Sequence, residues 1–271
     1  MGITEILITP LRMLLTAYCF IQFAVQVLWL GHWQMPRIMK SGTDQKASRK
    51  KALHAAHIQV SAYLKTLSFL QLVKFTFEGQ PHKSPCVIVS NHPGLLDIIV
   101  FLKDFPNAIC LFKSESLDNR VLSSFLKVGG YIEGIDGTGS SNKRIIASSC
   151  ERLNEGHHMI FFPEGTRSPS ATSMRKFRTT AFHTAVKSGY PLQPIAIYCQ
   201  PLFLGKNQKW SSFSRRTNHM TIRYLPAINI DNLAEDKRNA AGLLETARDS
   251  ISTALAEMSS KQPGSTQPKN Q

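Results

Sequence analysis

The amino-acid sequence predicts an α/β fold in which a mostly parallel sheet is flanked by helices, with an N-terminal motif of two membrane-associated helices. Short apolar runs alternate with helical stretches from residue 86 to residue 199, as in parallel sheets covered on both faces. A charge-free segment also lies near the N-terminus. We expect the helical motif over residues 1–75, one α/β domain over 76–260 and a disordered tail over 261–271.

The first element is the segment 13–31, which carries no charged side chain. Its length is close to the ~20 residues that cross a bilayer core. Gln22 and Gln26 dilute its hydrophobicity, so a helix lying within one leaflet remains an alternative to a full span. A cleaved signal peptide is disfavoured, because Trp29 and Trp33 follow where a small-residue cleavage site would stand.

Positive charge follows this segment closely, which by the positive-inside rule places the remainder of the chain at the cytoplasmic face of the membrane. The expected membrane is the bacterial inner membrane. The basic residues concerned are Arg37, Lys40, Lys46, Arg49, Lys50 and Lys51.

The second element is an amphipathic helix over residues 48–73, predicted from apolar positions spaced by three and four residues. Paired with the first segment, it would form a helical hairpin on the bilayer. Packing against a soluble core is the alternative that its sequence leaves open. The apolar positions are Leu53, Ala56, Val60, Leu64, Leu67 and Leu70.

The domain that follows is predicted element by element from its apolar runs and turn residues. We expect strands over 86–91, 108–113, 130–135, 159–163 and 194–199. Helices are expected over 94–105, 117–127, 143–155 and 181–189, with a terminal helix over 232–258.

A basic and aromatic stretch over 206–223 has two open interpretations, a solvated hairpin or a lipid-facing patch. It contains Lys206, Lys209, Trp210, Phe213, Arg215, Arg216 and Arg223.

Overall charge and cysteine usage restrict the function. The formal net charge of +14 favours an anionic partner such as an acidic lipid surface, a phosphorylated substrate or nucleic acid. The 5 cysteines are scattered and form no CxxC pair, which argues against a disulfide framework and a zinc site. We expect a reducing compartment and no metal.

The first candidate site residue is His92, which directly follows the apolar run 86–91. Ligand sites of parallel sheets lie at the carboxyl ends of their strands. Asp97 would fall in the first turn of the next helix, and a Pro93-Gly94 bend would let its carboxylate reach His92 Nδ1. A histidine held in this way can remove a proton from an alcohol through Nε2. Taken alone, such a pair is more often a helix cap beside a loop histidine, so the other motifs decide the interpretation.

The second candidate group follows the strand expected over 159–163. Gly165 would let the backbone approach a ligand, Arg167 offers a planar donor suited to phosphate, and Glu164 would orient that arginine or a substrate hydroxyl. A surface turn with an ion pair is the alternative.

These motifs, in the order NHPGLLD, FPEGTR and PLQPIAI, resemble the glycerolipid acyltransferase family, which includes the 1-acylglycerol-3-phosphate acyltransferases. The resemblance covers about residues 75–230 and implies the α/β fold, an N-terminal two-helix membrane motif and an acyltransferase domain over 76–260. It implies that His92 is the base and Asp97 its partner. It places substrate binding at Glu164, Gly165, Thr166 and Arg167, with Lys113 and Arg178 in matching stretches.

One position departs from the family pattern. Gly137 stands where the family usually has an arginine, so one phosphate contact is expected to be missing. Lys143 or Arg144 would be the substitute, or the acceptor is not a simple phosphomonoester.

The resemblance implies transfer of a fatty acyl group from an acyl thioester, acyl carrier protein or coenzyme A, to the hydroxyl of a lysophospholipid in the membrane. No cofactor beyond this co-substrate and no nucleic acid partner are expected. One alternative keeps the chemistry but uses a lyso-aminolipid as acceptor. Another is a non-catalytic basic protein that binds a membrane surface or nucleic acid, which the charge alone would explain.

Overall fold

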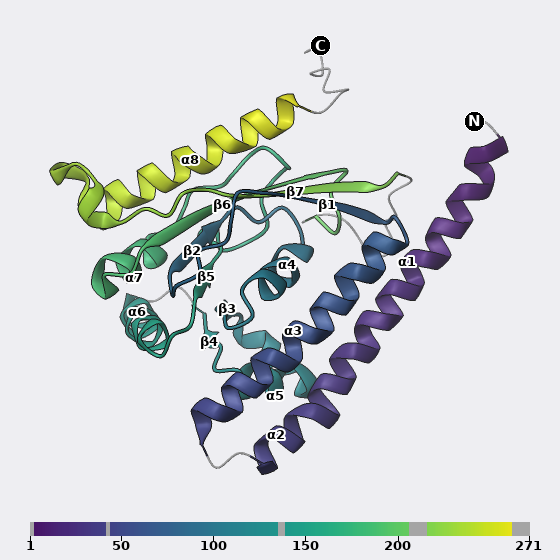
Figure 1. Ribbon diagram of the computed structural model, residues 1–271, viewed down its shortest axis with the longest axis horizontal. Coiled ribbons are helices and arrows are strands. Elements are labelled where there is room, and N and C mark those ends of the chain that lie inside the picture. The colour runs from purple at the N-terminus through teal and green to yellow at the C-terminus, as the bar shows by residue number, and fades with distance from the viewer. Residues whose placement is uncertain (1–2, 42–43, 135–138, 206–215, 262–271) are drawn as a thin grey trace.

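The computed structural model describes residues 3–41, 44–134, 139–205 and 216–261, and Figure 1 shows how their elements are arranged. In this part of the chain seven strands form one sheet in the order β1-β7-β6-β2-β5-β3-β4. All neighbours run parallel except β6 and β7, which are antiparallel. The strands are β1 (Val73–Glu78), β2 (Val87–Ser90), β3 (Ile109–Phe112), β4 (Ile132–Glu133), β5 (Met159–Phe161), β6 (Leu192–Gln200) and β7 (Asn218–Tyr224).

Helices cover both faces of this sheet (Figure 1). One side carries α1 (Ile3–Trp29), α3 (Gln45–Phe69), α4 (Leu96–Asp104) and α5 (Arg120–Val128). The other carries α6 (Gly139–Asn154), α7 (Thr180–Ser188) and α8 (Ala240–Ser260). A π-helical turn, Leu30–Gln34, joins α1 to α2 (Met35–Ser41). The predicted fold class, a mostly parallel sheet flanked by helices, is confirmed.

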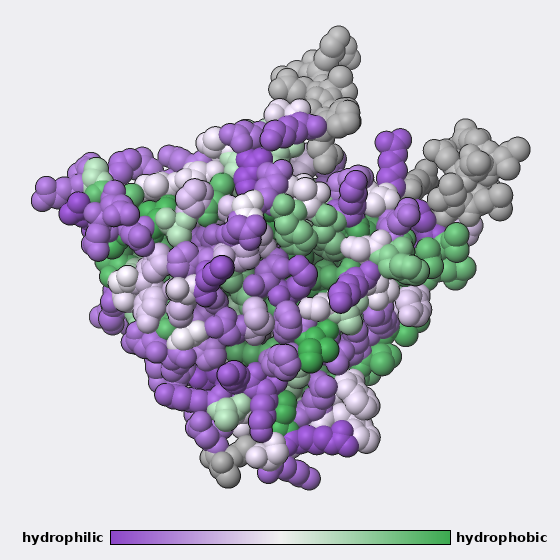
Figure 2. Space-filling model, viewed as in Figure 1, coloured by the Kyte–Doolittle hydropathy of each residue, from purple (hydrophilic) through white to green (hydrophobic). Residues whose placement is uncertain are grey.

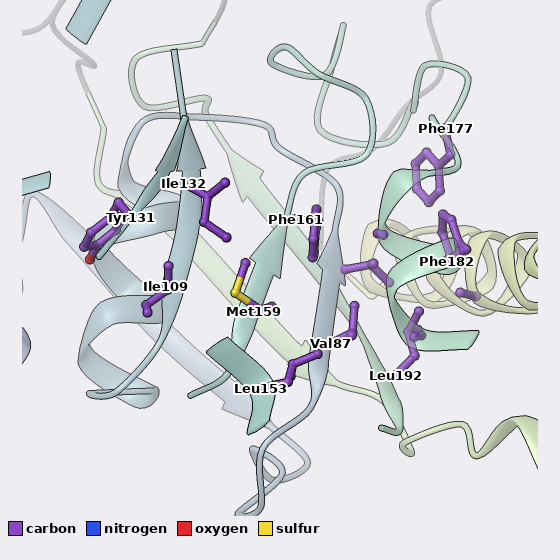
Figure 3. Close-up of a cluster of buried hydrophobic side chains, with 14 of the residues drawn as sticks. Val87, Ile109, Tyr131, Ile132, Leu153, Met159, Phe161, Phe177, Phe182 and Leu192 are labelled. Atoms are coloured by element: carbon purple, nitrogen blue, oxygen red, sulfur yellow. The ribbon is translucent and has the colours of Figure 1, made fainter. Parts of the chain in front are cut away.

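Two apolar cores follow from the alternation of side chains along the strands. Ile88, Ile160 and Ile197 point into the core beneath α3 and α4. Val87, Met159 and Phe161 point the other way, toward α6, α7 and α8, and Figure 3 shows them with Phe182 of α7. β2 is buried on both faces, as its uninterrupted apolar sequence predicts.

The strand β1 was not predicted from the sequence. The helix expected over 48–73 ends at Phe69, and Gln71 adopts a left-handed backbone conformation with φ 53° that turns the chain back. Val73 then begins an edge strand that pairs with β7. Because no glycine or proline marks the turn, the apolar spacing appeared to continue to Val73.

The basic stretch over 206–223 also differs from expectation in its described part. Residues 206–215 lie outside the described residues, but Asn218–Tyr224 forms β7 inside the sheet, so these positions are no solvated hairpin. The guanidinium of Arg223 contacts Glu78 of β1 and Glu257 of α8. The terminal helix begins at Ala240, later than predicted, where the Asn239 side chain caps it.

α1 is an apolar helix with an uncovered outer face. Leu14 is 69 % exposed and Ile21 is 64 % exposed. Within the described residues one helix, Pro10–Ser41, is both long enough and apolar enough to cross a membrane. Its inner face packs on α3, where Gln22 Nε2 donates to Thr66 Oγ1 at 3.0 Å. Gln22, which lowers the hydropathy of the segment, therefore faces α3 and not the outer face of α1. That outer face suits membrane association.

Candidate active site

The carboxyl end of β2 is fixed to β6 by a side chain that the sequence reasoning had passed over. Asn91 Nδ2 donates to the backbone oxygen of Ile197 at 2.7 Å, and Asn91 Oδ1 accepts from Ile197 N at 2.8 Å. The amide thus continues the sheet pairing for one more residue. His92 follows immediately, so its backbone leaves the sheet from a fixed point. An asparagine directly before the candidate base was the signal available in the sequence.

His92 and Asp97 come together as their spacing predicts. His92 Nδ1 lies 2.8 Å from Asp97 Oδ2, and the backbone N–H of Gly94 donates to the same oxygen at 2.9 Å. The Pro93-Gly94 bend therefore folds the loop around the carboxylate. The His92 ring stacks on Phe162 with centroids 4.1 Å apart. With Nδ1 held by the carboxylate, Nε2 is the nitrogen available to a substrate.

Asp97 is only 1 % exposed. Burial raises its pKa above the ordinary value, and the neighbouring charge of Glu164 raises it further, while the hydrogen bonds from His92 and Gly94 oppose the rise. Asp97 therefore holds the His92 ring from a position that water does not reach.

Glu164 is buried and joins the two motifs. Its Oε1 accepts from Ser168 Oγ at 2.5 Å and from the His92 backbone N–H at 3.3 Å, and its Oε2 accepts from Arg175 N at 2.7 Å. Ser168 N also donates to the His92 backbone oxygen at 2.7 Å. The carboxylate therefore holds the backbone on which the base sits, in place of the expected contact with Arg167. The sequence reasoning had not identified Ser168 as part of this contact.

Arg167 is anchored by the loop that follows β6. Its Nη1 donates to the backbone oxygens of Leu204 and Gly205 at 2.8 and 2.9 Å. The same loop lies against the turn that follows His92. A Cβ added to Gly94 in that turn would be 2.5 Å from Phe203 O. The guanidinium is thus fixed through one nitrogen.

Gly165 makes room for a second guanidinium. Its φ of 70° is a left-handed conformation that glycine adopts readily. A Cβ there would lie 3.0 Å from the Cζ of Arg178. The absence of a side chain at Gly165 therefore lets Arg178 lie against the backbone of the motif.

A cavity of about 410 Å³ connects these groups. Of the predicted site residues, Asp97 and Glu164 lie behind its wall as buried supports. The other six line it: His92, Lys113, Gly165, Thr166, Arg167 and Arg178. The His92 imidazole thus shares one cavity with three cationic side chains, a composition that attracts an anionic substrate. Gly137, where the family pattern has an arginine, lies outside the described residues. Neither of the expected substitutes, Lys143 and Arg144, lines the cavity.

A second cavity, of about 210 Å³, lies between α1, α3, α4 and α5, and its lining is almost wholly apolar. Two elements contribute to both cavities. α4 and the turn before it place Leu95 at the first and Ile98 and Ile99 at the second, while β3 places Leu111 at the first and Cys110 at the second. No group of three potential metal ligands comes together within the described ranges.

Comparison with known proteins gives a consistent result. The Acyltransferase family model matches residues 73–198. The chain is 27 % identical over 195 residues to the 1-acyl-sn-glycerol-3-phosphate acyltransferase of Saccharomyces cerevisiae, covering 69 % of this chain and 60 % of that protein. It is 25 % identical over 131 residues to the lyso-ornithine lipid O-acyltransferase of Rhodobacter capsulatus, covering 46 % of each.

The fold has a close counterpart among solved structures. The crystal structure of the 1-acyl-sn-glycerophosphate acyltransferase from Thermotoga maritima matches with a TM-score of 0.74 and 19 % identity, covering 94 % of this chain and 99 % of that one. The chain spans about three fifths of the length of the yeast relative. The motifs, the family model over residues 73–198, the curated relatives and the fold all support the glycerolipid acyltransferase family.

Proposed function

We propose that the protein is an O-acyltransferase that moves a fatty acyl group from an acyl thioester to the hydroxyl of a lysophospholipid such as 1-acylglycerol-3-phosphate. The observation that carries the proposal is the His92–Asp97 pair at 2.8 Å, facing a cavity with three cationic side chains. A base for a hydroxyl and a site for phosphate are the two groups that such an acceptor requires.

His92 Nε2 takes the proton of the acceptor hydroxyl while its oxygen attacks the thioester carbonyl carbon. The tetrahedral intermediate then expels the thiolate, which recovers the proton from the His92 imidazolium. Asp97 stabilises that imidazolium and keeps Nδ1 protonated. The attacking hydroxyl belongs to the substrate, so the protein needs no nucleophile of its own. No cofactor beyond the thioester enters this scheme.

Lys113, Arg167 and Arg178 bind the acceptor phosphate in this proposal. Among the described residues only Nη1 of Arg167 has protein partners, the Leu204 and Gly205 oxygens, so we assign the other edge of the guanidinium to the ligand. Thr166 adds a hydroxyl at the same wall. The acyl chain occupies the apolar cavity, since α4 and β3 line both spaces.

The donor is acyl carrier protein or coenzyme A, both of which are anionic and suit a chain of net charge +14. The protein acts at the cytoplasmic face of the bacterial inner membrane. Basic residues beyond α1, such as Arg37 and Lys40, favour that orientation.

The experiment replaces His92 with alanine in the full chain and measures acyl transfer to lysophosphatidic acid in purified membranes, with acyl carrier protein and coenzyme A thioesters in parallel. We expect a loss of about 10²–10⁴-fold in turnover. His183→Ala is the matched control, because His183 is exposed on α7 and lines neither cavity. Unchanged turnover of His92→Ala would disprove the mechanism.

A second acceptor, a lyso-aminolipid, is favoured by Gly137 and by the likeness to the lyso-ornithine lipid enzyme. The chemistry is unchanged and the head group differs. Competition between lysophosphatidic acid and lyso-ornithine lipid for one acyl donor separates the two. Acylation of lyso-ornithine lipid alone would replace the phosphate acceptor, whereas acylation of lysophosphatidic acid alone would remove this candidate.

A further inference from the structure

The cavity that contains His92 has exposed cationic side chains beside it, on the side of α6 and α7. They occupy two segments that a hydrogen bond joins, because Thr180 Oγ1 at the start of α7 donates to Asn142 Oδ1 of α6 at 3.1 Å. Thr180 also lines the cavity, so both segments reach its edge. Four exposed cations lie on these segments, and we call them the rim cluster: Lys143, Arg144, Arg175 and Lys176.

The rim cluster has no neighbouring negative charge along the chain. No aspartate or glutamate occurs over residues 165–230, and none occurs over residues 142–150 of α6. None of the ion pairs among the described residues includes a member of the cluster. By contrast, the Arg223 guanidinium pairs with both Glu78 and Glu257. Gathered cations without partners attract an anionic molecule and raise its local concentration.

The geometry favours a protein over a membrane or a small anion as that partner. The uncovered apolar face belongs to α1, which lies on one side of the sheet, whereas α6 and α7 lie on the other (Figure 1). A bilayer in contact with α1 is therefore separated from the rim cluster by the sheet. The four cations line neither cavity, so they present an open surface in place of a pocket. Such a surface matches the acidic face of a protein.

We propose that the rim cluster is the docking surface for an acidic acyl carrier protein that delivers the acyl chain to His92. The proposal rests on the proposed function and chooses between its two donors. The acidic face of the carrier contacts α6 and the segment before α7, and its prosthetic arm passes Thr180 and brings the thioester to His92. Exposed Glu115 and Asp118, which follow the lining residue Lys113 on the side of α5, repel the same acidic face and orient the carrier.

The test uses three donors that carry one palmitoyl chain on the same arm: palmitoylated acyl carrier protein, palmitoyl coenzyme A and uncharged palmitoyl pantetheine. The full chain in neutral detergent acylates lysophosphatidic acid, and kcat/KM for each donor is measured at low salt. Two variants reverse the charge of the rim cluster in pairs, Lys143→Glu with Arg144→Glu and Arg175→Glu with Lys176→Glu. Arg175 contacts Glu164 through its backbone N–H, which the substitution retains.

In each variant we expect kcat/KM with the carrier protein to fall by about tenfold, and with the other two donors by less than about threefold. The loss should disappear near 1 M salt, where charges are screened within ~3 Å. Lys50→Glu with Lys51→Glu is the matched control, because it makes the same change in net charge at two exposed lysines of α3. This control should leave all three values close to wild type.

Three results would overturn the proposal. Unchanged kcat/KM for the carrier protein in both variants would show that the rim cluster does not dock it. Equal losses with the carrier protein and coenzyme A would assign the cluster to the coenzyme's phosphates. Weaker binding of the variants to vesicles that contain phosphatidylglycerol, with unchanged kcat/KM in detergent, would assign it to the membrane.

Docking is also measured without turnover, as binding of the carrier protein to His92→Ala in detergent. Adding either charge-reversed pair to His92→Ala should weaken this binding by about tenfold. Binding that depends on the rim cluster, together with no transfer from any of the three donors in the wild type, would contradict the proposed function and support the docking surface. Transfer in the wild type with carrier binding that ignores the cluster would do the reverse.

Discussion

At the scale of single residues, Asp97 carries two opposing roles. It receives hydrogen bonds from His92 and Gly94, yet it is almost completely removed from water. Burial raises its pKa, so its charged form is less stable in the folded protein than in the unfolded chain. The ionised carboxylate that hydrogen-bonds to His92 therefore lowers the stability of the folded protein.

Asp97→Asn is expected to lower turnover by about 10²–10⁴-fold, because an amide cannot stabilise the imidazolium. The same change is expected to raise the free energy of unfolding at pH 7. A raised folded pKa means that the wild type loses stability as pH rises from the ordinary aspartate value of 3.8 to the raised value, and the variant does not.

Chemical denaturation between pH 4 and pH 8 measures this difference. It should be small at the acidic end and reach a plateau above the raised pKa. Asp249→Asn on α8, which lines neither cavity near His92, is the control and should change neither quantity. A variant that is inactive and also less stable at pH 7 would show that the carboxylate stabilises the fold.

The sequence predicted the contact of His92 with Asp97 because both residues lie within one short loop, where spacing nearly determines distance. It could not predict what Glu164 contacts, because its partners include His92 N, which is remote in sequence. The anchoring of Arg167 by Leu204 and Gly205 depends on how a distant loop returns, and no local pattern records that.

At the scale of elements, α3 is attached to the domain through an ion pair between buried Arg49 and half-buried Glu155. Arg49 is 2 % exposed and its Nη1 contacts Glu155, which also accepts from Arg152 Nη1 at 2.9 Å. The guanidinium lies over Gly130, where an added Cβ would be 2.2 Å from Arg49 Nε. From its sequence position this arginine was assigned to the basic cluster at the membrane surface. Periodicity could not show that it turns inward.

Arg49→Met is expected to destabilise the protein by about 1.5–3 kcal/mol, because it removes a charged hydrogen bond and leaves the half-buried carboxylate of Glu155 with one cation fewer. Lys50→Met is the matched control, because Lys50 follows Arg49 on α3 and its side chain is exposed. Denaturant unfolding in detergent measures both. Equal stability of the two variants would show that the ion pair contributes nothing net, and a double variant with Glu155→Gln would then be no less stable than either.

The edge strand β1 illustrates the limit of sequence patterns for elements. Residues 73–78 alternate in burial only as far as Thr76, and they are too few to outweigh the helical spacing that precedes them. By contrast, β2 and β6 are mostly apolar and almost wholly buried on both faces, and their existence was predictable from their apolar sequence.

At the scale of the whole molecule, many of the exposed large apolar side chains lie on α1. The chain has a net charge of +14, and Figure 2 shows apolar side chains along the side of the molecule occupied by α1, with polar side chains over most of the remaining visible face. Trp29 and Trp33 stack at the end of α1, and the Arg37 guanidinium lies 4.0 Å from the Trp33 ring centroid. Aromatic and basic groups in this order suit a membrane–water boundary.

Binding of the full chain to vesicles is therefore expected to have two components. Anionic vesicles should bind more protein than zwitterionic ones at low salt, and the difference should vanish near 1 M salt, where charges are screened within ~3 Å. The remaining binding should be lost in Ile21→Lys, because a lysine on the outer face of α1 costs ~3 kcal/mol in the bilayer.

Lys46→Glu is the control that affects only the first component, because Lys46 is exposed at the start of α3. Co-sedimentation at graded salt measures both variants. Complete release of the wild type at high salt would mean that α1 does not enter the bilayer.

The two ends of α3 are joined to the domain in different ways, by the Arg49 ion pair near its start and by the turn into β1 at its finish. Because both ends of α3 are attached, the helix cannot rotate relative to the sheet. Because α1 packs on α3, the position of His92 relative to the apolar outer face of α1 is set by the architecture.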